Sequence, residues 1–281
     1  MNPVIEVSGL RKSYGDHMVL KGISFQVMPG EIFALLGGNG AGKTTALECI
    51  EGLRSYDGGS ITVRGKKGIQ LQSASLPSHI KPMEAVQLFA KWNRTPVDQS
   101  ILNVLEIDKI RKKQYMELSV GQKRRLHLAL ALVGRPDILF LDEPTAGLDV
   151  EGRASLHEYL RKLRPQGKTV VLASHDMTEI ENLCDRIGIL TDGRLSFFGT
   201  IPELTERLGR RYIISIKTEQ GTKQFETDHI GDTMLTLLED YRNRNITVLD
   251  IKEQNVTVED IRIDRGSLEE HFVEIARRVG Q

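Results

Sequence analysis

Residues 37–44 read GGNGAGKT, and this stretch decides the fold because it fits the pattern GxxxxGK[ST]. The apolar run Glu31–Leu36 before it predicts a buried strand, and a helix is predicted over about Lys43–Glu51. Glycines between strand and helix allow the backbone to curl until successive N–H groups point inward at an anion. The positive end of the helix dipole adds to the attraction. The stretch therefore predicts a phosphate-binding loop.

Two side chains of this loop have predicted roles. Lys43 is expected to reach the β- and γ-phosphates of a nucleotide, and the Thr44 hydroxyl is expected to ligate Mg²⁺. The alternative is a glycine-rich turn with an incidental lysine. The spacing of the motif, together with the strand before it and the helix after it, disfavours this alternative. The loop residues predicted to contact the nucleotide are Gly37, Asn39, Gly40, Ala41, Gly42, Lys43, Thr44 and Thr45.

A second apolar run, Ile138–Leu141, ends in two carboxylates, Asp142 and Glu143. A carboxylate at the end of a buried strand costs free energy unless it is paired, so we assign Asp142 to Mg²⁺. Side chains alternate along a strand, which directs Glu143 to the other side, where it can orient or deprotonate the attacking water. An ordinary strand exit with solvated acids is the alternative for this motif taken alone.

Strands and helices are predicted to alternate through most of the chain. Such alternation predicts an α/β fold, with a mostly parallel sheet and helices on its faces. Short strands with turns between them precede the phosphate loop and also follow its helix. The predicted strands are Val4–Ser8, Val19–Leu20, Ser24–Met28, Ile61–Val63, Thr169–Ala173 and Arg186–Leu190, and the predicted helices are Pro82 to about Asn93, Gln99–Leu105, Ser119–Val133, Glu151–Leu163 and Met177–Cys184.

The pattern changes after about Leu208. We expect an ATPase domain over residues 1–208 and a small α+β accessory domain over 209–281. The second segment has no phosphate loop and no paired acids in a motif context. It is hypothesised to be regulatory or to support dimerisation, and a passive extension is the alternative. Its predicted elements are the hairpin strands Tyr212–Lys217 and Lys223–Glu226, the helix Thr233–Arg242, the strand Thr247–Glu253 and the helix Ser267–Arg278.

Charge and cysteine content limit the class of protein. The 38 basic residues equal the 38 acidic ones, which argues against a nucleic-acid partner. Cys49 and Cys184 form no CxxC pair, so neither a disulfide framework nor a zinc site is indicated. The N-terminus does not read as a signal peptide, and no apolar run approaches the ~20 residues that cross a bilayer. A membrane part would have to come from another chain.

Residues 118–122, LSVGQ, stand directly before a predicted helix and resemble the signature motif of ABC ATPases. The family form has glycine where this chain has Val120. Ser119 and Gly121 keep the family's residues, and the resemblance implies that these two and Gln122 contact nucleotide phosphate. Ser119 is also a favourable helix N-cap, which is the structural interpretation of the same residue.

Other family motifs follow in the family's order, so the resemblance covers about residues 3–205. It implies that Tyr14 stacks on adenine, that Gln72 lies near Mg²⁺ and water, and that His175 contacts the γ-phosphate. Gln70 is a rival for the glutamine, and the register against the family favours Gln72. Residues 146–149, AGLD, resemble the D-loop that crosses the subunit interface.

The resemblance implies a P-loop NTPase fold, in which a RecA-like core sheet carries an N-terminal antiparallel β subdomain and a helical subdomain at about 78–135. It implies the ATP-binding and hydrolysing subunit of an ABC transporter, of the exporter type for drugs, lipids or polysaccharides. Such a subunit uses ATP and Mg²⁺, with Glu143, His175 and Gln72 in catalytic roles and Thr44, Gln72 and Asp142 at the metal. The expected location is cytoplasmic, on the inner face of the cell membrane.

The same resemblance implies two kinds of partner. Two such subunits pack head to tail around two ATP molecules, either as a homodimer or with a similar ATPase subunit, and transmembrane permease subunits bind the pair. The alternative is a soluble ABC ATPase of DNA repair or of the ribosome. The short interval between Lys43 and Ser119 leaves no room for the long coiled coil of the first kind. The single cassette argues against the second kind.

Overall fold

The computed structural model describes residues 2–70, 76–146, 148–174, 176–208, 212–218, 221–227, 229–243 and 258–265. The chain divides into two compact units, Met1–Ile201 and Pro202–Gln281. The predicted boundary after Leu208 lies one helix later along the chain, at the end of α8 (Ile201–Leu208). Each unit is described by itself.

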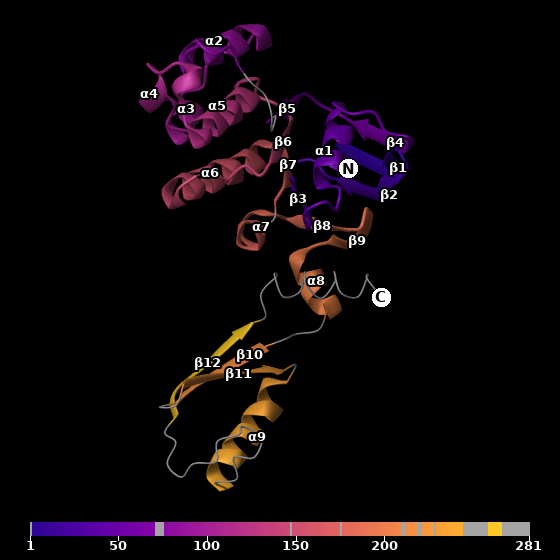
Figure 1. The fold of residues 1–281 in the computed structure, drawn as a ribbon, viewed down its shortest axis with the longest axis vertical. Coiled ribbons are helices and arrows are strands. Elements are labelled where there is room, and N and C mark those ends of the chain that lie inside the picture. Colours follow the sequence, from indigo (N-terminus) through magenta and orange to yellow (C-terminus); the bar gives the residue numbers. More distant parts are fainter. Residues whose placement is uncertain are drawn as a thin grey trace. The chain divides into compact units, whose positions relative to one another are not determined.

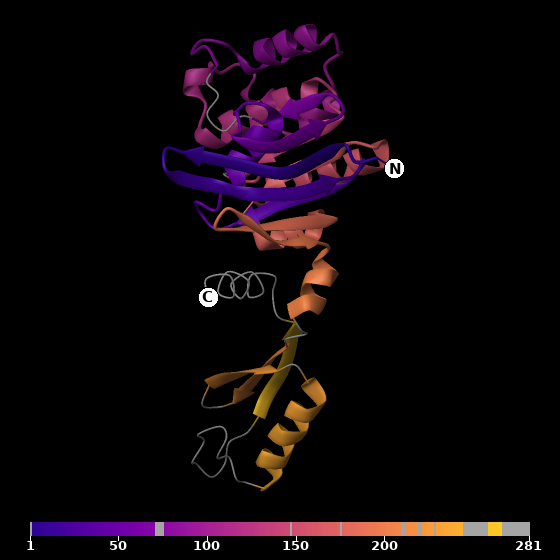
Figure 2. The ribbon, with the colours of Figure 1, turned by 90° about the vertical axis from the view of Figure 1, so that its right-hand side faces the viewer.

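The first unit begins with an antiparallel sheet of three strands in the order β2-β1-β4 (Figures 1 and 2). The strands are β1 (Ile5–Tyr14), β2 (His17–Val27) and β4 (Gly58–Val63). The sequence predicted two short strands in place of β2. The structure has one continuous strand, because β2 pairs with β1 along its whole length and the register shifts absorb the break in alternation.

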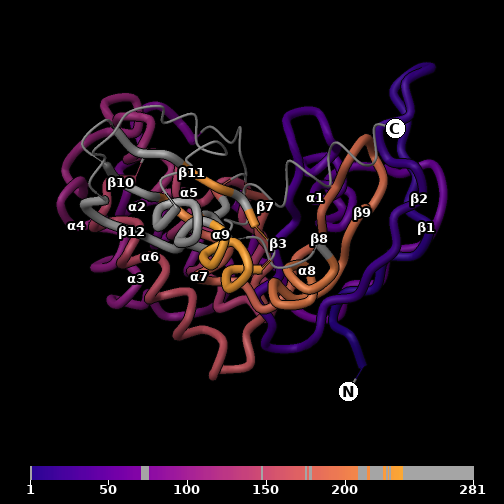
Figure 3. Tube along the Cα trace, turned by 90° about the horizontal axis from the view of Figure 1, so that it is seen from below, coloured from indigo at the N-terminus to yellow at the C-terminus, as the bar shows by residue number. Residues whose placement is uncertain are grey.

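A six-stranded sheet in the order β5-β6-β7-β3-β8-β9 forms the centre of this unit. All its pairings are parallel except that of β9 with β8, and these two strands lie side by side in Figure 3. The predicted α/β class with a mostly parallel sheet is confirmed. The strands are β3 (Ile32–Gly37), β5 (Lys67–Ile69), β6 (Ile138–Asp142), β7 (Thr169–Ala173), β8 (Arg186–Thr191) and β9 (Arg194–Gly199).

Helix α1 (Lys43–Glu51) lies between the two sheets, and its buried residues join one core with both of them (Figure 1). Phe33 of the central sheet stacks on Phe25 of the antiparallel sheet with ring centroids 5.2 Å apart. Helices α6 (Val150–Leu163) and α7 (Met177–Leu183) lie on the other side of the central sheet. Both faces of the parallel strands are therefore covered, which explains their unbroken apolar sequences.

The helical part lies between β5 and β6 in the chain, as the sequence predicted. Helix α2 packs against α5, and a short 3₁₀ helix, Tyr115–Glu117, precedes α5. The helix α4 was not predicted, because four residues carry too little periodicity. The helices are α2 (Pro82–Asn93), α3 (Gln99–Val104), α4 (Ile107–Ile110) and α5 (Val120–Val133).

The second unit contains an antiparallel sheet in the order β11-β10-β12 and the helix α9 (Ile230–Asn243). The predicted hairpin is present as β10 (Tyr212–Thr218) and β11 (Gly221–Thr227). The strand β12 (Val258–Arg265) was missed because charged residues interrupt its alternation. The predicted strand 247–253 and helix 267–278 lie outside the described residues. No helix in the described part of the chain is long and apolar enough to cross a membrane.

Candidate nucleotide site

At the end of β3, where the glycine-rich loop begins, Gly37 is packed too closely for a larger residue. A Cβ atom on Gly37 would lie 2.7 Å from the Leu190 carbonyl oxygen and 2.9 Å from the Ala41 Cβ. Gly42 has φ +102° and serves as the N-cap of α1 without a side-chain cap bond. The first N–H groups of α1 therefore stay available to an anion.

Lys43 lies across this loop. Its Nζ donates to the carbonyl oxygens of Gly37, at 2.7 Å, and Gly38, at 3.3 Å. Burial lowers the pKa of the Lys43 ammonium, and the nearby carboxylates of Glu143 and Asp142 act in the opposite direction. A half-buried cation held among loop carbonyls is well placed to bind phosphate oxygens.

The end of β6 brings a carboxylate to the start of α1. Asp142 Oδ2 accepts a hydrogen bond of 3.2 Å from the Thr44 hydroxyl. Burial raises the pKa of Asp142, the bond from Thr44 partly offsets this increase, and the charge of Glu143 adds to it. A half-buried carboxylate beside a hydroxyl is an oxygen donor set that a Mg²⁺ ion fits, since the cation would offset the cost of partly burying the charge.

Glu143 follows Asp142 with φ +50°, a backbone conformation that is uncommon for residues other than glycine. Its N–H donates to the carbonyl oxygen of Ala173 at the end of β7, with a distance of 2.9 Å. The chain turns here across the carboxyl end of the sheet. Glu143, Asp142 and Lys43 all line one open pocket of about 580 Å³.

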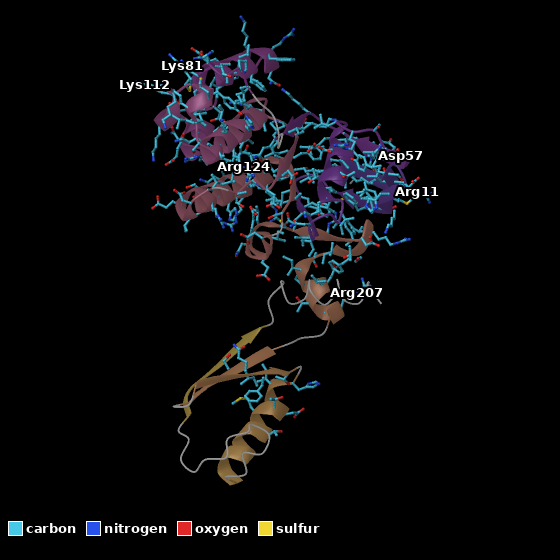
Figure 4. All side chains as sticks on the ribbon, viewed as in Figure 1. Arg11, Asp57, Lys81, Lys112, Arg124 and Arg207 are labelled. Carbon is cyan, nitrogen blue, oxygen red and sulfur yellow. The ribbon has the colours of Figure 1, made fainter. Side chains whose placement is uncertain are left out.

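The pocket brings together several of the predicted residues and includes others. Arg124 of α5, labelled in Figure 4, was not predicted, and Ala146 was predicted only as part of the D-loop. Arg124 Nη1 donates to the Ala146 carbonyl oxygen at 3.0 Å. Only the fold joins these two segments, so no local pattern could indicate the contact. The full lining is His17, Val19, Gly38, Asn39, Gly40, Ala41, Gly42, Lys43, Thr44, Thr45, Arg124, Asp142, Glu143 and Ala146.

Other predicted residues do not line this pocket. The Tyr14 ring is 43% exposed and lies beneath two cations, with Lys12 Nζ 5.7 Å and Arg54 Cζ 5.3 Å from its centroid. Ser119 caps α5, and its hydroxyl accepts from the Gln122 N–H at 3.3 Å. The side chain of Val120 beside it is 73% exposed. Stacking of Tyr14 on adenine and phosphate contacts of the signature residues, Gly121 included, remain predictions.

Three predicted residues, Gln72, Gly147 and His175, lie outside the described residues. The rival Gln70 is described. Its side chain is 6% exposed and its Oε1 atom is buried with no hydrogen-bond partner among the described residues, while its N–H donates to the Phe140 carbonyl oxygen at 3.0 Å. Its position beside β6 does not decide between the two glutamines.

Known proteins resemble this chain in sequence. A family model described as ABC transporter matches residues 20–146. An uncharacterized ABC transporter ATP-binding protein of Methanocaldococcus jannaschii is 36% identical over 214 residues, which are 74% of this chain and 82% of that relative. The chain belongs to the ABC transporter ATP-binding proteins. The family resemblance inferred from the sequence is thereby confirmed, and this family hydrolyses ATP.

Two further relatives of this ABC protein have more specific names. The linearmycin resistance ATP-binding protein of Bacillus subtilis is 33% identical over 259 residues, with 84% of this chain and 83% of the relative covered. The Nod factor export ATP-binding protein I of Rhizobium etli is 39% identical over 222 residues, with 73% and 70% covered.

Solved structures support the ABC fold of the first unit. An ATP-binding subunit of an ABC transporter has a TM-score of 0.67 at 24% identity, with 73% of this chain and 93% of that chain covered. A bacterial ABC transporter cassette, whose structure is dimeric, has a TM-score of 0.63 at 24% identity, with 70% and 98% covered.

Glu51, at the end of α1, is a buried carboxyl group that the sequence did not single out. Burial raises the pKa of Glu51 to about 7, and the neighbouring Asp142 and Glu48 act in the same direction. Lys67 acts in the opposite direction, and its Nζ donates to the Glu51 carbonyl oxygen. The folded protein therefore keeps the Glu51 proton at pH values where the unfolded chain has released it.

We predict that Glu51→Gln removes a loss of stability that accompanies rising pH. The folded pKa is raised above the ordinary value near 4.5, so the contribution of Glu51 is fully present below that value and is lost as pH rises through about 7. As pH rises from acid to mildly alkaline, the free energy of unfolding of the wild type should fall by about 1–3 kcal/mol more than that of the variant. Urea unfolding of the nucleotide-free protein at about pH 5 and about pH 8 measures this. Equal pH dependence of the two proteins would contradict the assignment.

Proposed function

We propose that this chain is the ATP-binding and hydrolysing subunit of an exporter, which pairs with a second ATPase subunit and drives a separate membrane permease. The observation that carries the proposal is the single pocket that joins Lys43, Thr44, Asp142 and Glu143 from two strand ends. A phosphate-binding loop, an acidic donor for a cation and a second carboxylate are the groups that phosphate-ester hydrolysis needs.

Each group has a definite task in this proposal. The N–H groups at the start of α1 and the Lys43 ammonium bind the β- and γ-phosphates and hold the γ-phosphate in line with the attacking water. Thr44 and Asp142 hold Mg²⁺, which when bound neutralises charge on the phosphate oxygens. Glu143 accepts the proton of the attacking water at its carboxylate. His175 and Gln72 are proposed to assist at the γ-phosphate and at the metal, and Tyr14 to stack on adenine.

The proposed dimer is supported by the place of the signature residues. Ser119 and Gly121 stand at the start of α5 and do not line the pocket of their own chain. A second subunit packed head to tail would supply them to the phosphates, with Gln122, so that ATP becomes part of the interface. Loss of the γ-phosphate would remove those contacts and let the pair open. A solved cassette structure of similar fold is itself dimeric, which supports the proposal that two subunits pair.

The proposed direction of transport comes from the relatives. Two of them are named for linearmycin resistance and for Nod factor export. We propose the same direction here, with permease subunits in the membrane and the ATPase on its cytoplasmic face. No nucleic-acid partner is proposed, because the chain has no net charge.

We predict that Glu143→Gln lowers ATP hydrolysis by at least ~100-fold, the scale of a lost general base. ATP binding should persist, because the amide keeps the size of the side chain and the loop is unchanged. The variant should also form a longer-lived ATP-bound dimer. Steady-state hydrolysis and gel filtration with ATP measure these effects.

The control is Glu158→Gln, because this exposed carboxylate pairs only with Lys162 along α6 among the described contacts. Its hydrolysis rate should equal that of the wild type. A Glu143→Gln variant that hydrolysed ATP at nearly the wild-type rate would remove Glu143 from the mechanism.

For the second unit we propose a regulatory or dimer-supporting role. All the nucleotide motifs precede it, and the described part of this unit after α8 contains a small antiparallel sheet and the helix α9. We propose that this unit binds protein and does not carry a second catalytic site.

A chain that ends at Leu208 should therefore still bind ATP, while dimerisation or coupling to the permease should weaken. Nucleotide titration, gel filtration and transport by the reconstituted complex measure the three properties. If the shortened chain stayed folded by circular dichroism but lost nucleotide binding, the proposed domain division would be wrong. Normal dimerisation and transport would instead favour a passive extension.

A further inference from the structure

Glu179 of α7 is a buried carboxylate that the proposed mechanism does not use. Its side chain is 2% exposed and makes polar contacts with side chains of three other segments. Its Oε2 atom accepts from the hydroxyl groups of Thr145, at 3.1 Å, and Ser174, at 2.9 Å. Nε2 of His157 on α6 lies 3.2 Å from its Oε1 atom. One carboxylate therefore ties together the ends of β6 and β7 and two helices.

The contact with Thr145 holds the segment that carries Glu143. Glu143 has φ +50°, a strained conformation that persists only when its surroundings enforce it. Thr145 is 5% exposed and stands two positions later, and its carbonyl oxygen accepts from the Leu148 N–H at 3.0 Å. A bond from Thr145 to a buried anion fixes this turn at a point close to Glu143.

The contact with Ser174 holds the end of the neighbouring strand. Ser174 is fully buried, and its hydroxyl also accepts from the Asp176 N–H at 3.1 Å. It directly follows Ala173, whose carbonyl oxygen accepts from the Glu143 N–H. The backbone partner of Glu143 and the turn that follows Glu143 are therefore both fixed by the same Oε2 atom.

We propose that Glu179 is a positioning residue for ATP hydrolysis, which acts through Thr145 and Ser174 to keep Glu143 directed into the phosphate pocket. The inference rests on the proposed role of Glu143. Burying a carboxylate costs free energy, and the hydroxyl groups of Thr145 and Ser174 and the His157 ring offset that cost. A carboxylate oxygen accepts from two hydroxyl groups more strongly than a neutral oxygen does, so Glu179 holds the segments after β6 and β7 at one point.

Glu179→Gln and Thr145→Val test the proposal. Glutamine keeps the size of Glu179 but can no longer accept strongly from both hydroxyl groups, and valine removes the Thr145 donor at nearly constant shape. Each variant should lower kcat about tenfold while the KM and the Kd for ATP stay within about twofold of the wild type. Thr145→Ser, which keeps the hydroxyl, should restore the rate. If Glu179→Gln fails to fold, Thr145→Val alone decides.

Glu31→Gln is the matched control. Glu31 is another buried carboxylate, 7% exposed, which accepts from the Met28 N–H at 2.6 Å and pairs with Arg186. It directly precedes β3, whereas the pocket lies at the other end of that strand. This variant should lose stability and keep its kcat. An equal fall in kcat would show that loss of any buried carboxylate suffices, and the proposal would be wrong.

The decisive experiment combines Glu179→Gln, or Thr145→Val, with Glu143→Gln. Because Glu179 acts through Glu143, neither change should lower the single-turnover rate of the Glu143→Gln protein any further. A second tenfold loss in that background would overturn the proposal. Wild-type rates in both single variants, beside an inactive Glu143→Gln, would overturn this inference alone. Full activity of Glu143→Gln would instead contradict the proposed function.

Discussion

The parallel order of β6, β7 and β3 is the constraint on which the rest of this structure depends. Parallel neighbours present their carboxyl ends at the same edge of a sheet, so the segments that follow them must meet there. The phosphate loop follows β3, Asp142 and Glu143 end β6, and Ser174 follows β7. The site exists because of this topology. The helices and the antiparallel sheet cover the faces that the parallel strands would otherwise expose.

Close packing at this edge sets the electrostatics of the pocket. Burial acts against the charge of Lys43 and Asp142, so the pKa of each group shifts in the direction that favours its neutral form. Phosphate and a divalent cation would reverse that tendency at Lys43 and Asp142, because each half-buried group would gain an opposite charge beside it. The site therefore stores unfavourable free energy that the ligands of an ATPase can relieve.

Sequence alone predicted the parts whose signal is local. The strand–loop–helix of residues 31–51 and the acidic strand end were predicted because glycines, apolar runs and charges stand together in the chain. Continuous β2 and the short α4 were missed, since pairing with β1 and packing against neighbouring helices decide them.

Contacts between distant segments had no signal in the sequence. Arg124 reaches Ala146, and Glu179 reaches Thr145, only because the fold brings α5, α7 and the turn after β6 together. The contact of Arg54 with the Tyr14 ring belongs to the same class, because Arg54 comes from the segment after α1. For Gln72 and His175 the predictions from the resemblance still stand as predictions.

The central claim is that the loop at the end of β3 binds the phosphates of ATP through Lys43. Titration of a fluorescent ATP analogue into the wild type and into Lys43→Ala tests it most directly. Lys168→Ala is the control, because Lys168 pairs with Asp137 at the opposite end of the sheet. The account predicts at least about tenfold weaker binding for Lys43→Ala, the loss expected for a charge-assisted contact, and unchanged binding for the control. Wild-type affinity in Lys43→Ala would contradict the account.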